Sequence, residues 1–127
     1  MNDIAIEVNT SKNFDEAVVS VLQSVDKQGW ALFQIYDIKE RLAAKGFEFE
    51  RLKIIEICSA KHASRLLKKN KLASLCMPCK INVIETKGKV TITGMNPLMI
   101  TEIFPDITKQ DVAAVEADIR MMVEGSA

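Results

Sequence analysis

Two runs rich in β-branched residues, 80–86 and 89–93, are separated only by Lys87 and Gly88. Runs of this composition favour β-strands. Two parallel strands need a connection of a dozen or more residues, whereas two antiparallel strands can be joined by a two-residue turn. The Lys87–Gly88 pair therefore predicts a tight hairpin, and the sheet of this chain must be at least partly antiparallel.

The clearest helical pattern lies between Asn13 and Gly29. Asn13 is a suitable N-cap, and Glu16 three residues later can complete a capping box. Gly29 predicts the end of the helix, because glycine adopts the left-handed conformation at little energetic cost. Apolar residues recur at spacings of three and four and form one face: Phe14, Ala17, Val18, Val21, Leu22 and Val25.

Three further strands are predicted over residues 4–8, 30–36 and 52–57, and a helical pattern follows each of them. A short apolar helix over 98–104 follows Asn96–Pro97, and a last helix spans about residues 109–123. Polar residues that can cap helices precede three of these segments: Asp37 with Glu40 completing a capping box, Ser59, and Thr108 with Asp111.

The alternation of strands and helices extends over all 127 residues without a repeat, a low-complexity segment or a linker. This length is typical of one domain, so we expect a single domain over residues 1–127. Strands of this kind, with amphipathic helices between them, favour two packed layers. The predicted fold is an α+β two-layer sandwich of about five mostly antiparallel strands, with helices packed on one face.

Composition and charge argue against several functional classes. Lys and Arg balance Asp and Glu at 17 each, so net charge attracts neither nucleic acid nor membrane. The basic segment 65–71 contains no aromatic residue for base stacking, and no apolar stretch approaches the ~20 residues of a membrane span. Met1–Ile4 shows no signal-peptide pattern, and an odd number of cysteines, three, argues against a disulfide scaffold. We expect a cytoplasmic protein with no nucleic-acid or membrane partner.

Two of the cysteines lie at the predicted ends of strands. Cys58 ends the run 52–57, and Cys79 directly precedes the run 80–86. Because a sheet brings distant strand ends together, we expect the thiols of Cys58 and Cys79 to lie close to each other in the fold. Cys76 would contribute to the same site. The N-terminus of the helix capped by Ser59 would favour a thiolate at Cys58.

His62 lies about one helical turn from that N-terminus, where it could act as a proton partner or a metal ligand. The candidate binding site therefore consists of Cys58, Cys76, Cys79 and His62. Its ligand would be a small anionic or sulfur-containing molecule or a soft metal, which thiolates select. Three thiols and one imidazole could also form a Cys₃His zinc site, although their spacing matches no known zinc module. The identity of any metal or cofactor stays open.

Three alternatives remain beside the binding site. Cys76 and Cys79 form a Cys-x-x-Cys pair that could act in thiol redox chemistry, but in thioredoxin-type sites this motif opens a helix, and here it leads into a strand. The chain could instead be a structural module that dimerises through Met121 and Met122 on the last helix. The cysteines could also simply be buried as small hydrophobic residues, and His62 could be a surface residue.

No paired carboxylates or nucleophile motif stand out in the sequence. Asp37 is better explained as a helix cap than as a catalytic acid. We therefore assign no catalytic residue and favour a non-enzymatic role.

The order and spacing of several short motifs resemble the family known as Domain of Unknown Function 302, over about residues 11–105. The resemblance implies a compact α+β domain, paired as a homodimer, with no established activity. Cys58 and Cys79 match the two cysteine positions of the family, whereas Cys76 stands where the family usually has an aliphatic residue. The family commonly has Asn-Pro after the first cysteine, and this chain has Ser59–Ala60. The resemblance depends on these residues: Phe14, Ala17–Val18, Gly29–Trp30, Asp37, Cys58, Ala63, Met77–Pro78–Cys79 and Asn96–Pro97.

Overall fold

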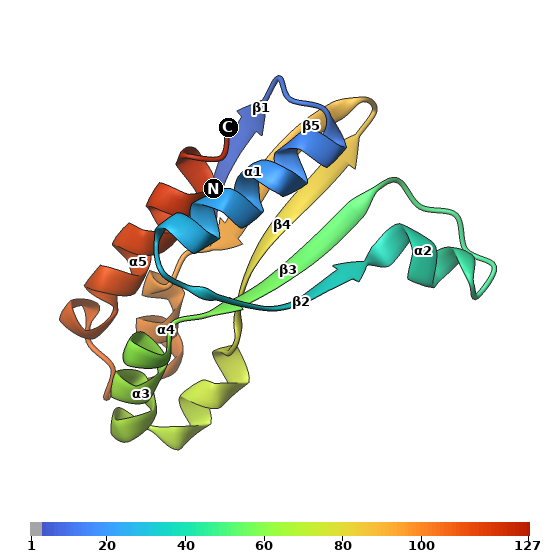
Figure 1. The fold of residues 1–127 in the computed structure, drawn as a ribbon. Helices are drawn as coiled ribbons and strands as arrows, with labels where there is room; N and C mark the ends of the chain where they lie inside the picture. Colours follow the sequence, from blue (N-terminus) through green and yellow to red (C-terminus); the bar gives the residue numbers. More distant parts are fainter. Residues whose placement is uncertain (1–3) are drawn as a thin grey trace.

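The computed structural model describes residues 4–127, and it forms a single five-stranded sheet in the order β1-β5-β4-β3-β2 (Figure 1). All four neighbouring pairs of strands are antiparallel, which confirms the predicted sheet and extends it, since the sequence required only one such pair. The segment Met1–Asp3, on which part of the signal-peptide argument depends, lies outside the described residues. The strands are β1 (Ala5–Thr10), β2 (Ala31–Asp37), β3 (Leu52–Cys58), β4 (Cys79–Thr86) and β5 (Lys89–Met95).

Helices cover one face of this sheet, as the sequence predicted. In Figure 1, α1 and α5 lie next to each other against the sheet, and α1 contacts β2, β4 and β5, whereas α5 contacts β1 and β5. Among the described residues, no helix is long and apolar enough to cross a bilayer. The helical segments are α1 (Phe14–Lys27), α2 (Ile38–Ala43), α3 (Ala60–Lys69), the 3₁₀ helix η1 (Lys71–Cys76), α4 (Leu98–Ile103) and α5 (Lys109–Glu124).

The main core lies between the sheet and helices α1 and α5. The predicted apolar face of α1 is confirmed, because all of its members are buried except the partly buried Leu22. A second, smaller cluster joins α3, η1, α4 and the start of α5, through Leu66, Ala73, Ile100, Phe104, Ile107 and Val112. The main core consists of residues from the sheet and from both helices: Ile6, Phe14, Ala17, Val18, Val21, Val25, Trp30, Ile55, Ile57, Ile81, Val83, Val90, Ile92, Val115, Ile119, Met122 and Val123.

The predicted turns and caps are present with one exception. Lys87 and Gly88 both have positive φ, at 52° and 81°, which is the geometry of a two-residue hairpin turn. Asn13 and Thr108 form complete capping boxes, and Ser59 caps α3. Asp37 accepts a hydrogen bond from the backbone N–H of Glu40, at 3.0 Å, but within residues 4–127 the return bond of a capping box is not formed. Asp37 is thus a cap, and the prediction that Glu40 completes a box was wrong.

Gly94 on β5 packs closely against α5. A Cβ atom there would lie 3.1 Å from Cγ2 of Ile119 and 3.4 Å from Cγ2 of Val123. We expect Gly94→Val to lower the free energy of unfolding by about 2–3 kcal/mol, because extra methyl groups in a filled core displace their neighbours. Urea denaturation measures the change. The control is Thr93→Val, which faces the opposite side of the sheet, and an equal effect of both substitutions would contradict this close packing.

Candidate functional site

The sheet brings Cys58 and Cys79 to the same end of two neighbouring strands. Cys58 is the last residue of β3, and Cys79 is the first residue of β4. In the antiparallel register, Cys79 pairs with Ile57, the residue directly before Cys58. The strand ends that the sequence predicted to meet are therefore adjacent in the fold.

The third cysteine reaches this place through η1, an element that the sequence did not predict. Cys76 is the last residue of η1, and Met77 and a cis Pro78 connect it to Cys79 at the start of β4. Cys76 packs against the smaller apolar cluster, whereas Cys79 packs against the main core. The two thiols therefore lie where the two apolar clusters of the molecule meet.

Two neighbouring cavities occupy this junction. The small cavity has a volume of about 30 Å³, room for one or two water-sized molecules. The large cavity measures about 220 Å³ and includes Lys80 and Met95 in its lining. Cys76 and Cys79 line both cavities. Cys58 and His62 line the small one, so all four candidate residues of the sequence surround it.

Burial controls the ionisation of two of the thiols. It raises the pKa of Cys79 to about 11, and the neighbouring Cys58 thiol adds to this increase. Burial also raises the pKa of Cys58 above its ordinary value. The prediction that the N-terminus of α3 favours a thiolate at Cys58 was wrong, because the loss of hydration raises the pKa of this thiol and outweighs any benefit from the helix. Both groups are neutral thiols near pH 7.

This shift predicts a distinctive pH dependence for the alkylation of Cys79. Only the thiolate reacts, and at pH 8 a thiol with a pKa of about 11 holds roughly a hundredth of the thiolate of an ordinary cysteine. We expect native Cys79 to react with iodoacetamide about 100-fold more slowly than the same residue in urea-unfolded protein. The native rate should rise about tenfold per pH unit from pH 8 to 10. Peptide mass spectrometry of quenched samples measures it, and a native rate that levels off near pH 9 would contradict the buried environment.

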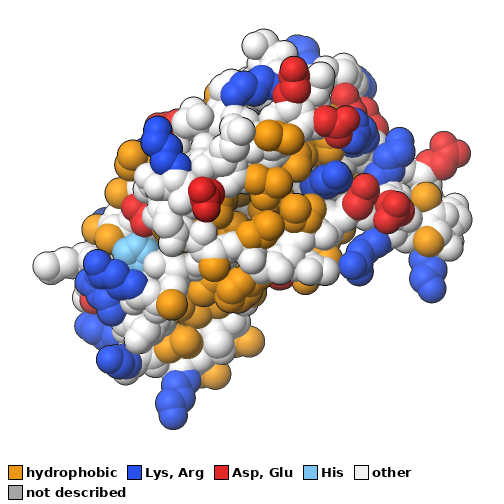
Figure 2. All heavy atoms as spheres, viewed as in Figure 1, with side chains coloured by type: hydrophobic (Ala, Val, Ile, Leu, Met, Phe, Trp, Pro, Cys, Tyr) orange, Lys and Arg blue, Asp and Glu red, His pale blue; other side chains and the backbone are white. Residues whose placement is uncertain are grey.

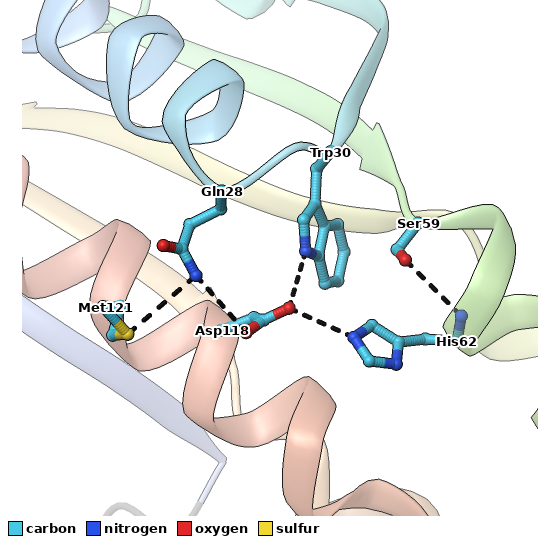
Figure 3. A network of polar contacts seen from close by, with 6 residues as sticks. All are labelled: Gln28, Trp30, Ser59, His62, Asp118 and Met121. Atoms are coloured by element: carbon cyan, nitrogen blue, oxygen red, sulfur yellow. Dashed lines mark hydrogen bonds and ion pairs between the residues drawn. The ribbon is translucent and has the colours of Figure 1, made fainter.

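His62 is held by a carboxylate that the sequence analysis did not identify. Asp118 on α5 lies between three side chains (Figure 3). Its Oδ2 accepts a hydrogen bond from Nε1 of Trp30, at 2.9 Å, and lies 3.1 Å from Nε2 of His62. Its Oδ1 accepts a hydrogen bond from Nε2 of Gln28, at 3.3 Å. An ionised carboxylate only accepts, so His62 presents Nε2–H to it.

This network joins four elements beside the small cavity. Gln28 follows α1, Trp30 precedes β2, His62 belongs to α3, and Asp118 comes from α5. The Trp30 and His62 rings also contact each other, with centroids 5.7 Å apart, and both line the small cavity. Asp118 thus fixes two walls of the cavity. It also engages Nε2 of His62, so this nitrogen is occupied by a carboxylate rather than free for a metal.

Two signals in the sequence point toward this network. Trp30 is the single tryptophan and follows a helix stop, and a buried indole N–H needs an acceptor. Asp118 lies three residues after Val115 and four before Met122, on the apolar face of the last helix. A carboxylate on such a face needs a partner. The sequence could not identify that partner, because Trp30 and Asp118 are 88 residues apart.

In the part of the chain that the structure describes, this site holds neither an assembled zinc centre nor an activated Cys79 thiolate. Within residues 4–127, no three His, Cys, Asp or Glu side chains are close enough to hold a metal ion together, so the Cys₃His zinc arrangement is not assembled. Cys79, with its raised pKa, is a poor nucleophile at neutral pH. What remains is a pair of apolar cavities lined by soft sulfur atoms.

Comparison with known proteins connects this architecture to a family. The sequence profile of the domain of unknown function DUF302 matches residues 6–125. The crystal structure of an uncharacterized conserved protein DUF302 from Bacillus stearothermophilus is similar in fold, with a TM-score of 0.90 at 24% identity over 98% of each chain. A comparison with the curated proteins finds no match. The match to the profile covers nearly the whole chain, and we conclude that the chain belongs to the DUF302 family.

Proposed function

We propose that this domain binds a small soft ligand, either a sulfur-containing molecule or a soft metal ion, at the two cavities beside the end of η1 and the start of β4. The observation that carries the proposal is that Cys76 and Cys79 line both cavities, with Cys58 and His62 beside them. Thiol groups offer such ligands soft donor atoms that an ordinary apolar core does not. The domain acts by binding and not by catalysis.

The physical environment of the thiols disfavours the redox alternative. In a redox-active Cys-x-x-Cys pair of the thioredoxin type, the first thiol lies at a helix N-terminus that stabilises its thiolate. Here the first thiol belongs to Cys76, which ends η1, and Cys79 opens β4, so neither thiol lies at a helix N-terminus. All three cysteines are free, which is consistent with a reducing compartment such as the cytoplasm.

Ligand-induced stabilisation tests the binding proposal. Thermal unfolding of the wild-type protein is measured with Zn²⁺, Cu(I), glutathione and sodium sulfide as separate probes. A probe at 100 times its Kd stabilises the native state by about 2.7 kcal/mol. We expect at least one probe to raise the Tm of the wild type but not that of Cys79→Ser. In parallel, the metal content of wild-type and variant protein purified without chelator is measured. Unchanged Tm values with every probe, together with substoichiometric metal in all variants, would overturn the proposal.

A second copy of the chain is the macromolecular partner that we propose. Residues 38–50 form an arm that extends from the body in Figure 1, and α2 within it has no buried residue. Phe47 and Phe49 in the arm are 65% and 50% exposed, and Leu32 and Phe33 on β2 are 48% and 57% exposed. Figure 2 shows hydrophobic side chains gathered across the face between α1 and this arm.

The topology favours a twofold pairing through β2. This strand is at one edge of the sheet, so its outer hydrogen-bonding groups can pair with another strand. Antiparallel pairing of β2 with a second β2 would place each arm, which follows β2, beside Leu32 and Phe33 of the other copy. The arm carries three basic residues and three acidic ones, so its net charge is zero and does not oppose the approach of a second copy. Reciprocal burial of this kind is what a twofold interface requires.

Sedimentation tests this interface. We expect the wild type to be a dimer, and Phe33→Asp and Phe49→Asp to be monomers at the same concentration. The control is Ile103→Asp on α4, because Ile103 is 59% exposed but lies away from β2. A monomeric wild type, or equal dissociation by Ile103→Asp, would refute the pairing.

A further inference from the structure

The lining of the large cavity restricts the type of ligand that it can hold. Its polar side-chain groups are the thiols of Cys76 and Cys79 and the ammonium group of Lys80, and Met95 adds a thioether. No carboxylate and no imidazole is present in this lining. Hard cations such as Mg²⁺ and Ca²⁺ require several oxygen ligands, so they are excluded.

The number of sulfur ligands discriminates further among soft metals. A structural zinc ion takes four protein ligands, and within residues 4–127 no cluster of even three His, Cys, Asp or Glu side chains is present. A monovalent d¹⁰ ion differs, because Cu(I) forms stable complexes with only two thiolates. Soft thiolate and thioether ligands also select Cu(I) over harder ions.

We propose that Cys76 and Cys79 bind one Cu(I) ion between their sulfur atoms at the junction of the two cavities. This inference rests on the proposed function and specifies its ligand. The binding step is balanced as two thiols and one Cu⁺ giving a bis-thiolate complex of charge −1 and two protons released to solvent. Copper keeps its oxidation state, so no oxidant or reductant takes part.

Two features of the surroundings support this complex. Lys80 directly follows Cys79 and lines the same cavity, so its positive charge offsets the negative charge of the complex. The rest of the lining is apolar, with Leu75, Pro97, Ile100 and Ile119 around the sulfur atoms. The lining therefore offers Cu(I) no carboxylate or imidazole ligand that would compete with the sulfur atoms. Cys58 also neighbours Cys79, but it does not line the large cavity that contains Lys80, so we assign the pair to the two thiols that line both cavities.

An anaerobic competition titration tests the assignment, with Cu(I) supplied by a chromogenic Cu(I) chelator of known affinity. We expect the wild type to remove one Cu(I) per chain from the chelator. Loss of an outer-shell partner alone reduces metal affinity 10–100-fold, so loss of a ligand in Cys76→Ser or Cys79→Ser should reduce it by about 100-fold or more. Cys58→Ser tests the exclusion of the third thiol, and we expect it to bind Cu(I) more tightly than Cys76→Ser or Cys79→Ser. The control outside the site is Met121→Leu on α5, at a residue that is 60% exposed, and we expect its affinity to stay within about threefold of the wild type.

Folding of the variants is checked separately. Circular dichroism and thermal unfolding are recorded for each protein, and Cys79→Ala replaces Cys79→Ser if the buried hydroxyl group unfolds the domain. An affinity in Cys58→Ser as low as in Cys76→Ser would overturn the assignment, as would a wild type that binds Cu(I) no better than a variant without cysteines. If Zn²⁺ or glutathione stabilises the wild type while Cu(I) does not bind, only the Cu(I) inference fails. If no probe binds, the proposed function fails as well.

Discussion

Met122→Glu should unfold this domain. The Met122 side chain has no exposed surface and packs in the main core between α5 and the sheet. A carboxylate at this position would be buried without a partner, which belongs to the small class of substitutions that cost more than about 4–5 kcal/mol. Domains of this size are stable by only about 5–15 kcal/mol, so most or all of the stability would be lost. Far-UV circular dichroism and urea denaturation measure the effect.

The adjacent residue provides a matched control. Met121 is 60% exposed, and its contact is a weak one, with Nε2 of Gln28 3.9 Å from its sulfur atom. We expect Met121→Glu to change the free energy of unfolding by less than about 0.5 kcal/mol. The hypothesis of dimerisation through both methionines is therefore corrected for Met122, because this residue belongs to the core. A Met122→Glu protein that folds with near wild-type stability would contradict this conclusion.

Asp118→Ala should also cause a large loss of stability, together with a change at the site itself. It removes the acceptor of the Trp30 indole N–H and the partner of His62 Nε2. Trp30 is only 6% exposed. In the variant, its indole N–H group would therefore have no hydrogen-bond acceptor unless a water molecule enters the protein. Hydrogen bonds to charged groups contribute about 1.5–3 kcal/mol each, and Asp118 is partly exposed, so we expect a total loss of about 2–3 kcal/mol.

Fluorescence reports the same change at the site itself. The chain has one tryptophan, so the emission of the native protein comes from Trp30 beside the small cavity. We expect a red shift in Asp118→Ala as water reaches the indole ring. Glu116→Ala on the same helix is the control, since its salt bridge with Arg120 is on the surface and should contribute less than about 0.5 kcal/mol. Equal stability losses in both variants, with unchanged emission, would show that Asp118 does not hold the indole.

Local patterns were sufficient to predict most elements of the fold. The hairpin at Lys87–Gly88, the N-caps Asn13 and Thr108 and the apolar face of α1 all depend on residues within a few positions of each other. By contrast, η1 was not predicted, because its residues show no clear amphipathic period. The position of β1 beside β5, at the edge opposite β2, is also a consequence of long-range packing.

The candidate site could be predicted only in part, again where local patterns determine it. The strand ends at Cys58 and Cys79 follow from where apolar runs stop, and the structure places them in neighbouring strands. The partner of His62 could not be predicted, because Asp118 is 56 residues away. The raised pKa of Cys79 could not be predicted either, because it reflects burial between two apolar clusters that form only in the folded chain.

X-ray absorption at the copper edge of the one-to-one Cu(I) complex tests the shared sulfur site most directly. It reports the elements bound to the metal, independently of any effect on folding. For the wild type and for Cys58→Ser, we expect a first coordination shell of sulfur alone, with two thiolate ligands from Cys76 and Cys79. A first shell that contains nitrogen or oxygen would place the metal elsewhere, at His62 or a surface carboxylate, and would contradict binding by this pair of thiols.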